Sequence, residues 1–191
     1  MPWRPITIGA ALRAAAARSP DRDFIVEAEG AERRFGFKAF DGMVDDLARA
    51  LLDLGLKRGD HLALWMTNKP EWLLVWLAAA RIGVALAPIN TRYKADEAAY
   101  ILKQADAKAL FVMDRYWDID YLAMVRAIRP GLPDLAHVVL WGDRAPEDMT
   151  ALNDLLARGR SSNADLAAAE AAITPDDPLI IVYTSGTTGQ P

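Results

Sequence analysis

A regular pattern of apolar positions runs through the chain between residues 40 and 52. The spacing i, i+3, i+4, i+7 is followed by Phe40, Met43, Val44, Leu47, Ala48, Leu51 and Leu52. This spacing places apolar side chains on one face of an α-helix. Gly55 follows, and glycine readily adopts the left-handed conformation that ends a helix. We therefore predict an amphipathic helix that buries one face and ends at Gly55.

Beyond this helix, apolar runs of strand length alternate with helical patterns. The predicted strands are 61–66, 84–89, 109–113 and 137–141, and the predicted helices between them are 71–82, 96–104 and 118–128. Strands rich in Val, Leu and Ala that are separated by helices are typical of βαβ units with right-handed crossovers. The sequence thus predicts an α/β fold with a mainly parallel sheet flanked by helices.

The N-terminal part has its own local signals. Thr7 is a suitable N-cap for a first helix that ends at Pro20, and two short strands, 24–26 and 33–37, flank the turn residues 29–30. We expect one helix followed by a β-hairpin.

The run 72–89 is apolar over nearly the length of a membrane span. Arg81 lies near its centre, where an arginine costs about 2.5–3.5 kcal/mol on membrane-insertion scales. Gly83 and Pro88 also interrupt a helix. Helix, glycine turn and buried strand therefore explain this run better than a transmembrane segment does.

Residues 159–177 contain Gly159, Ser161, Ser162, Asn163 and Pro175 around an alanine-rich helical turn, which is typical of a surface connector. The apolar run 179–183 then predicts a buried strand. We expect an N-terminal α/β subdomain over 1–158, a connector over 159–178, and a strand with the start of a ligand-binding loop over 179–191.

Charge and composition narrow the classes of partner. Lys and Arg number 22 against 26 Asp and Glu, for a net charge of −4. This balance offers no basic stripe for nucleic acid. The chain has no cysteine, which excludes disulfides and thiolate metal sites within it and fits the cytoplasm. The alternative location is the mitochondrion, because the first twenty residues carry Arg4, Arg13 and Arg18 without an acidic residue.

The candidate ligand-binding loop follows directly after the apolar run 179–183. It is formed by Thr184, Ser185, Gly186, Thr187, Thr188 and Gly189. Glycines let a backbone approach a ligand closely, and amides and hydroxyls can donate to phosphate oxygens. The spacing is not that of a P-loop, and a flexible chain end is the alternative that composition alone leaves open.

The tract 183–191, Tyr-Thr-Ser-Gly-Thr-Thr-Gly-Gln-Pro, resembles the signature phosphate loop of the adenylate-forming enzymes, in which a lysine normally follows. Further tracts resemble acyl-CoA ligase landmarks and occur in the family's order: Pro20-Asp21, Leu54 to Asp60, Asn68 to Trp72, and Ala87 to Tyr93. The resemblance covers nearly the whole chain, and 90–93 is most similar to the fatty-acyl branch.

This resemblance implies the N-terminal portion of the family's large domain, incomplete at its phosphate loop. It implies a two-step reaction: a carboxylate attacks the α-phosphate of ATP, with Mg²⁺, to give an acyl-adenylate, and the thiol of coenzyme A then displaces AMP. Residues 184–189 would bind the ATP phosphates. The parent would be an AMP-forming acyl-CoA ligase for a fatty or other apolar acid. The truncated chain itself would be inactive, because the family's adenine pocket, magnesium carboxylate and C-terminal lysine lie downstream.

Other residues with reactive side chains have plainer interpretations. His61 and His137 each start a predicted strand and are expected to be structural. Asp114, Asp118 and Asp120 could hold a metal but are expected to cap a helix, so no metal ligand or catalytic residue is assigned. Arg92 follows a strand end, where α/β folds bind ligands, and a structural salt bridge is the alternative. The six tryptophans are expected to pack in the core and its grooves.

The sequence is also compatible with two alternative functions. One is an adenylating enzyme of another branch, for an aryl or amino acid. The other is a non-catalytic α/β binding module, if the natural chain ends here. Peripheral membrane association and a homodimer are further expectations for the parent, without a transmembrane segment.

Overall fold

A computed structural model describes residues 5–28 and 30–184 of the 191-residue chain. Its centre is a five-stranded parallel sheet with the strand order β4-β3-β5-β8-β9. The strands are β3 (His61–Trp65), β4 (Ala85–Pro88), β5 (Ala107–Val112), β8 (His137–Leu140) and β9 (Thr150–Ala151). The predicted α/β fold with a parallel sheet is confirmed.

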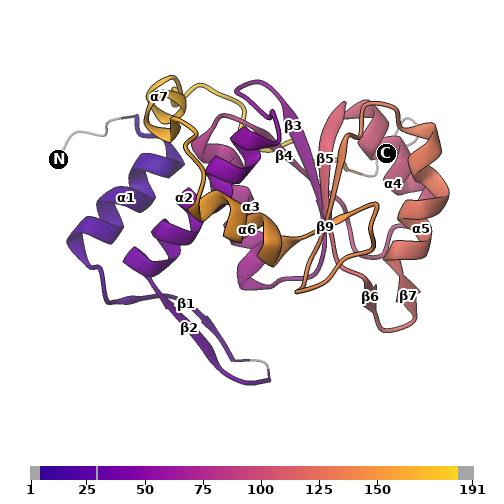
Figure 1. Ribbon diagram of the computed structural model, residues 1–191, viewed down its shortest axis with the longest axis horizontal. Coiled ribbons are helices and arrows are strands. Elements are labelled where there is room, and N and C mark those ends of the chain that lie inside the picture. Colours follow the sequence, from indigo (N-terminus) through magenta and orange to yellow (C-terminus); the bar gives the residue numbers. More distant parts are fainter. Residues whose placement is uncertain (1–4, 29, 185–191) are drawn as a thin grey trace.

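Helices cover both faces of this sheet (Figure 1). One face carries α2 (Phe37–Asp53), α3 (Pro70–Arg81) and α6 (Leu152–Arg160), with α1 (Ile8–Arg18) and α7 (Leu166–Ala171) packed against them. The other face carries α4 (Ala95–Gln104) and α5 (Tyr121–Ile128), after which comes the 3₁₀ turn η1 (Arg129–Gly131).

The amphipathic helix α2 is the centre of the first helical layer. Phe40, Val44, Leu47 and Leu51 on its apolar face are fully buried. The helix ends as predicted, because Gly55 has a φ of +85° just beyond it. Its other side meets α6 so closely that a Cβ added at Gly159 would lie 1.8 Å from the Asp46 carbonyl oxygen. The pattern of apolar positions did not predict α6 or β9.

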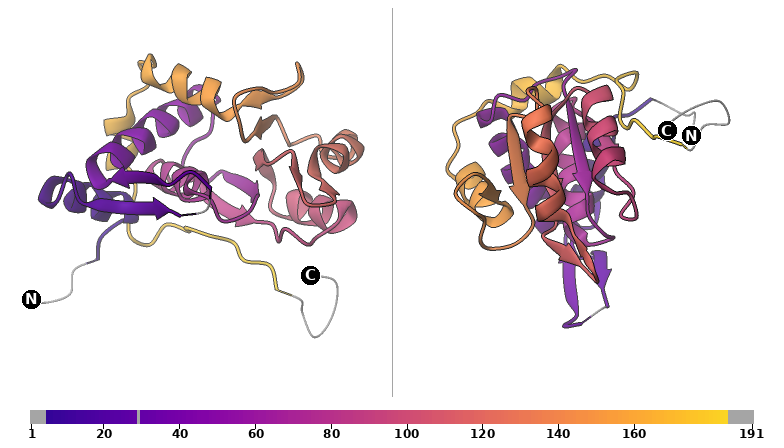
Figure 2. Two further views of the ribbon diagram at one scale, coloured as in Figure 1. Left: turned by 90° about the horizontal axis from the view of Figure 1, so that it is seen from below. Right: turned by 90° about the vertical axis from the view of Figure 1, so that its right-hand side faces the viewer.

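Two hairpins project from the same edge of the molecule. The predicted hairpin is present as β1 (Asp23–Glu27) and β2 (Arg33–Gly36), and Figure 2 shows it extending from one end of the molecule. A second, short hairpin is formed by β6 (Arg115–Tyr116) and β7 (Ile119–Asp120). This hairpin occupies the predicted start of the next helix at residue 118, and α5 begins at Tyr121 instead. The Asp120 carboxylate caps α5 by accepting a hydrogen bond from the Ala123 amide.

The long apolar run 72–89 divides into helix, turn and strand as predicted. No helix in residues 5–28 and 30–184 is long and apolar enough to cross a membrane. Arg81, at the end of α3, is fully buried and forms ion pairs with Asp41 and Asp45 of α2. Arg13 of α1 shares both carboxylates and also pairs with Glu170 of α7 at 2.7 Å. This charge cluster links α1, α2, α3 and α7 on one side of the sheet.

Candidate functional site

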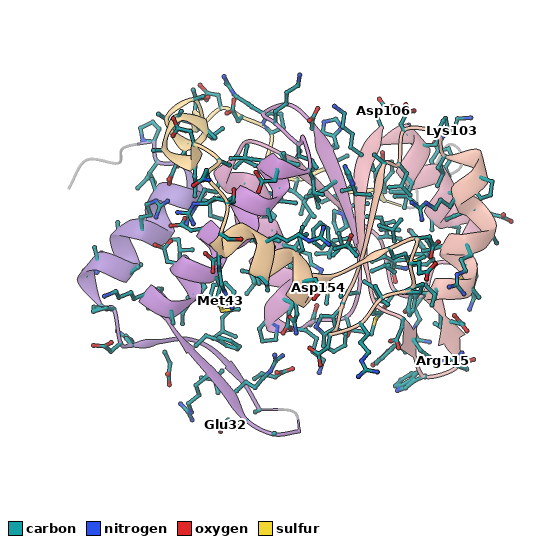
Figure 3. All side chains as sticks on the ribbon, viewed as in Figure 1. Glu32, Met43, Lys103, Asp106, Arg115 and Asp154 are labelled. Atoms are coloured by element: carbon teal, nitrogen blue, oxygen red, sulfur yellow. The ribbon has the colours of Figure 1, made fainter. Side chains whose placement is uncertain are left out.

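A cleft of about 570 Å³ opens at the carboxyl edge of the sheet. Parallel strands all end on one edge, so the loops after β3, β4, β5 and β8 converge there, which is where open α/β sheets bind ligands. The lining residues are Met66, Thr67, Asn68, Lys69, Thr91, Arg92, Met113, Arg115, Tyr116, Trp117 and Trp141. In Figure 3 the labelled Arg115 lies at this edge, whereas Asp106 and Lys103 lie at the opposite one.

Two buried aromatic side chains hold the loop after β4 against this cleft. The indole Nε1 of Trp65 donates to the Asn90 carbonyl at 3.1 Å, and the Tyr121 hydroxyl donates to the Thr91 carbonyl at 2.9 Å. Both side chains are fully buried, and burial raises the pKa of Tyr121 above its ordinary value. The hydroxyl therefore stays protonated and remains a donor. The two hydrogen bonds thus fix the backbone at 90–91 from the core side.

The tip of the β6–β7 hairpin contributes an exposed aromatic surface. Trp117 is 71% exposed, and its ring stacks on that of Tyr116 with centroids 5.0 Å apart. Its φ of +52° is unusual for a bulky residue and indicates a locally strained turn. Arg92, from the loop after β4, places its guanidinium 5.6 Å from the Trp117 ring centroid. An exposed aromatic face beside a cation suits a planar, anionic ligand.

The charges around the cleft differ in how they are paired. Arg115 pairs with Asp120 at 2.5 Å, and Lys69 pairs with Glu27 of the first hairpin at 3.1 Å. Within residues 5–28 and 30–184, no carboxylate lies at ion-pair distance from Arg92, so the predicted alternative of a structural salt bridge is not seen. The Thr67 hydroxyl, which also lines the cleft, is buried and has no hydrogen-bond partner in the same residues.

The predicted phosphate loop begins at the end of the described chain. Thr184 is exposed, and residues 185–189, which complete the predicted site, lie outside the described residues. The cleft contains none of the described part of this loop.

The segment before this loop differs from the predicted buried strand. It forms one parallel bridge, between Ile180 and Leu86 of β4, with hydrogen bonds on that side only among the described residues. Ile180 and Val182 are 39% and 63% exposed. The run lies along the edge strand β4 and passes toward α4, as the left view of Figure 2 shows. One face carries the exposed Ile180 and Val182, whereas Ile181 and Tyr183 pack against the core, so only one face is covered.

The two histidines and two of the three aspartates hydrogen-bond to the backbone. A ring nitrogen of His61 lies 2.7 Å from the Ala105 carbonyl, and one of His137 lies 3.0 Å from the Leu54 carbonyl. Asp114 accepts the Arg115 amide, and Asp120 caps α5. In the part of the chain that the structure describes, no group of three or more His, Asp or Glu side chains could hold a metal ion.

Sequence reasoning missed Trp117 as a site residue. It was expected to pack with the other tryptophans, but a hairpin turn carries it into solvent. One signal was available: Tyr116 and Trp117 are flanked by Asp114 and Asp118, and such a mixture of aromatic and turn-forming residues is unusual inside a helix.

The sequence profile of the AMP-binding enzyme family matches residues 12–191. The chain belongs to this family. Among its relatives, YngI of Bacillus subtilis, which bears the provisional name acyl-CoA synthetase, is 34% identical over 97% of the chain and 36% of its own length. The medium-chain acyl-CoA ligase ACSF2 of Macaca fascicularis mitochondria is 32% identical over 97% of the chain and 32% of its own length.

A solved structure extends the likeness to the fold. The anthranilate CoA ligase AuaEII, in complex with anthranoyl-AMP, superposes with a TM-score of 0.82 over 100% of this chain and 34% of its own, at 23% identity. The chain thus corresponds to the N-terminal part of acyl-CoA ligases and spans about a third of the length of the relatives it matches.

Proposed function

We propose that this chain is part of an ATP-dependent carboxylate–CoA ligase that forms an acyl-adenylate and then an acyl-CoA thioester. The observation that carries the proposal is the tract 183–191. It follows the edge-docked segment 179–181 without a break and lies within the family match. Its glycines, hydroxyls and backbone amides are residue types suited to phosphate oxygens.

The loop would act by electrostatic stabilisation. When a carboxylate displaces pyrophosphate from ATP, negative charge grows on the leaving group, and donors already held in place lower the barrier without reorganising. Thr184, Ser185, Gly186, Thr187, Thr188 and Gly189 are the donors that we propose. The proposed reaction consumes ATP and coenzyme A, and we assign the activation of the acid or the thiol to no described side chain.

Magnesium belongs to this proposal only through the family resemblance. The described residues offer no cluster of carboxylate or imidazole ligands for it. We therefore assign no magnesium ligand to residues 5–28 and 30–184.

The cleft at the carboxyl edge would bind the adenine nucleotide of one of the two substrates. Trp117 supplies a stacking face, and Arg92 supplies a cation that no carboxylate of the described residues neutralises. Trp117→Ala and Arg92→Ala should raise the KM for ATP if the cleft binds ATP, or for coenzyme A if it binds coenzyme A. An unchanged KM for both would remove the cleft from the mechanism.

Substitutions in the loop test the adenylation proposal. In the full-length enzyme, Thr187→Val or Thr188→Val should lower the rate of pyrophosphate release about 10²–10³-fold, which is the usual cost of losing one donor to a developing charge. The thioester-forming step, started from supplied acyl-adenylate, is the control and should change little. Wild-type adenylation kinetics in both variants would exclude the loop.

We further propose a fatty or other apolar acid as the substrate. Support comes from the similarity to a medium-chain acyl-CoA ligase and from the tract 90–93. A panel of fatty, aryl and amino acids in the pyrophosphate assay decides the class. Turnover of aryl or amino acids alone would favour the other adenylating branches, and no turnover of any acid would favour a binding module.

The setting of the enzyme in the cell is the last part of the proposal. We propose the cytoplasm, with peripheral membrane contact and a homodimer as further expectations for the full-length protein. Cell fractionation and light scattering of the full-length enzyme test these expectations, and recovery with mitochondria would favour the alternative location.

A further inference from the structure

Arg58 and Asp177 form a two-pronged ion pair between distant parts of the chain. Arg58 Nε lies 2.9 Å from Asp177 Oδ2, and Arg58 Nη2 lies 2.5 Å from Asp177 Oδ1. Two parallel bonds between a planar guanidinium and a carboxylate fix orientation as well as distance. The Asp177 side chain is only 14% exposed, although it lies near the surface.

The Asp177 carboxylate also closes its own turn. It accepts the Thr174 amide at 3.0 Å and the Thr174 hydroxyl at 3.2 Å, and the Asp177 amide donates back to the Thr174 carbonyl at 3.1 Å. The carboxylate therefore holds the turn 174–177 and the arginine at once. Neutralising it would loosen both.

Arg58, whose side chain is 49% exposed, is anchored through its backbone neighbour and its aliphatic stem. The neighbouring Gly59 amide donates to the Gly83 carbonyl at 2.9 Å, at the turn between α3 and β4. Gly83 has a φ of +72°, and a Cβ there would lie 2.7 Å from Arg58 Cγ and 2.6 Å from Ile173 Cδ1. The stem of Arg58 and the side chain of Ile173 thus pack over a glycine that leaves just enough room for them.

This junction lies immediately before the segment that leads to the predicted phosphate loop. Two residues after Asp177, the Leu179 carbonyl accepts the Leu86 amide at 3.2 Å, and the Ile181 amide then donates to the Leu86 carbonyl at 2.8 Å. These two bonds set the register of the segment on β4. No other strand among the described residues pairs with the segment. Besides the packing of Ile181 and Tyr183 against the core, the junction immediately before the segment can keep this register.

We propose that Arg58 and Asp177 are positioning residues for the phosphate loop at 184–189, an inference that rests on the proposed ligase function. A slip of one residue moves a strand by about 3.3 Å and turns each side chain to the other face. A displacement of about 1 Å can already cost an enzyme 10²-fold in rate. By fixing the register of 179–181, the pair would set the point at which the chain enters the loop, and neither residue is proposed to touch the nucleotide.

The first test uses the present chain and needs no enzymatic activity. In amide hydrogen exchange, Asp177→Asn should speed exchange of Ile181 at least about tenfold, as expected when a local opening becomes easier. Amides of β3 and β5 should be unaffected. Asp176→Asn is the matched control, because it removes the same charge from the exposed neighbouring residue and should leave Ile181 unchanged. Equal exchange of Ile181 in both variants would overturn the proposal.

The second test is a double-mutant cycle in the full-length enzyme. Arg58→Ala and Asp177→Ala should each lower kcat/KM for ATP about tenfold or more, and the double variant should be no worse than either, because the two residues act as one unit. Arg58→Lys should recover part of the loss. The KM for coenzyme A should stay constant, whereas general damage to the fold would change it as well.

The outcomes separate this proposal from the proposed function. A wild-type enzyme that forms no adenylate with any acid contradicts the ligase proposal, and hydrogen exchange at Ile181 then decides whether the pair fixes the segment. An active enzyme whose ATP kinetics are unchanged by Asp177→Ala contradicts the positioning role and leaves the ligase function intact.

Discussion

The ring of Trp65 stands edge-on to that of Tyr121, with centroids 4.9 Å apart and planes at 88°. Each ring also donates a hydrogen bond to the loop after β4, Trp65 to Asn90 and Tyr121 to Thr91. The pair joins β3, an interior strand of the sheet, to the start of α5. Core packing and the shape of the cleft therefore depend on the same two side chains.

Removing the Tyr121 hydroxyl should cost stability without creating a large cavity. Tyr121→Phe leaves the Thr91 carbonyl without its donor, and we expect a loss of about 1–2 kcal/mol in the free energy of unfolding. Urea denaturation followed by circular dichroism measures it. Tyr100→Phe on α4 is the control and should change little, since among the described residues the Tyr100 hydroxyl donates to no acceptor. Equal losses in both variants would contradict the role given to the Tyr121 hydrogen bond.

The buried ion pairs of Arg81 should be costly to break. Arg81→Ala leaves Asp41 and Asp45 partly buried without their central cation, and we expect a loss of about 3–5 kcal/mol. The matched control is Arg49→Ala, which removes a more exposed arginine paired with Asp46 at 3.6 Å. That change should cost no more than about 1 kcal/mol. A loss at Arg81 no greater than that at Arg49 would show that Arg13 alone can neutralise the two carboxylates.

Replacing glycine by alanine at two helical positions should change the stability of the protein in opposite directions. At Gly159 the new Cβ meets the Asp46 carbonyl of α2, so α6 must move away, and we expect a loss of about 1–3 kcal/mol. At Gly42, within α2, nothing lies within 4 Å of the added Cβ, so Gly42→Ala should stabilise the helix by about 0.5–1 kcal/mol. Thermal unfolding of both variants compares the two, and a higher melting temperature for Gly159→Ala would refute the close contact.

The Arg58–Asp177 pair predicts a change at low pH. The hydrogen bonds from Arg58, followed by that from the Thr174 amide, lower the pKa of Asp177 to about 2. An ordinary aspartate has a pKa of about 3.9, so the pair stabilises the fold fully above about pH 4 and loses its effect as the pH falls toward 2. NMR titration of the carboxyl carbon should show a midpoint near 2 that rises in Arg58→Ala. The same midpoint in both proteins would contradict the assigned cause.

The apolar pattern predicted most strands and helices of the fold, but not α6, β9 or the contacts between the layers. The helix at 40–52 and the alternation of strands and helices follow from spacing alone, because burial on one or both faces dictates it. Arg81 was evidence against a membrane span. Its partners Asp41 and Asp45, however, lie 40 and 36 residues earlier in the sequence, too far for a spacing pattern to reveal the pairing. Long-range ion pairs of this kind are decided by tertiary packing.

The candidate site was predictable only in part for a similar reason. The motif at 184–189 is local in sequence and could be recognised, whereas the cleft is assembled from four loops. Arg92 was identified as a candidate because it follows a strand end. Trp117 was not, since its exposure depends on a two-residue turn that competes with an otherwise plausible helix start.

The exposed indole of Trp117 gives the protein a built-in optical reporter. Of the tryptophans in residues 5–28 and 30–184, it is the most exposed, whereas Trp65 is completely shielded from water. Among the tryptophans of these residues, Trp117 should therefore emit furthest to the red and be quenched most readily by iodide. Because the Arg92 guanidinium lies near that ring, a ligand in the cleft that contacts either side chain should alter the signal. Ligand binding in the cleft can then be followed by tryptophan fluorescence, without an added label and before any product is formed.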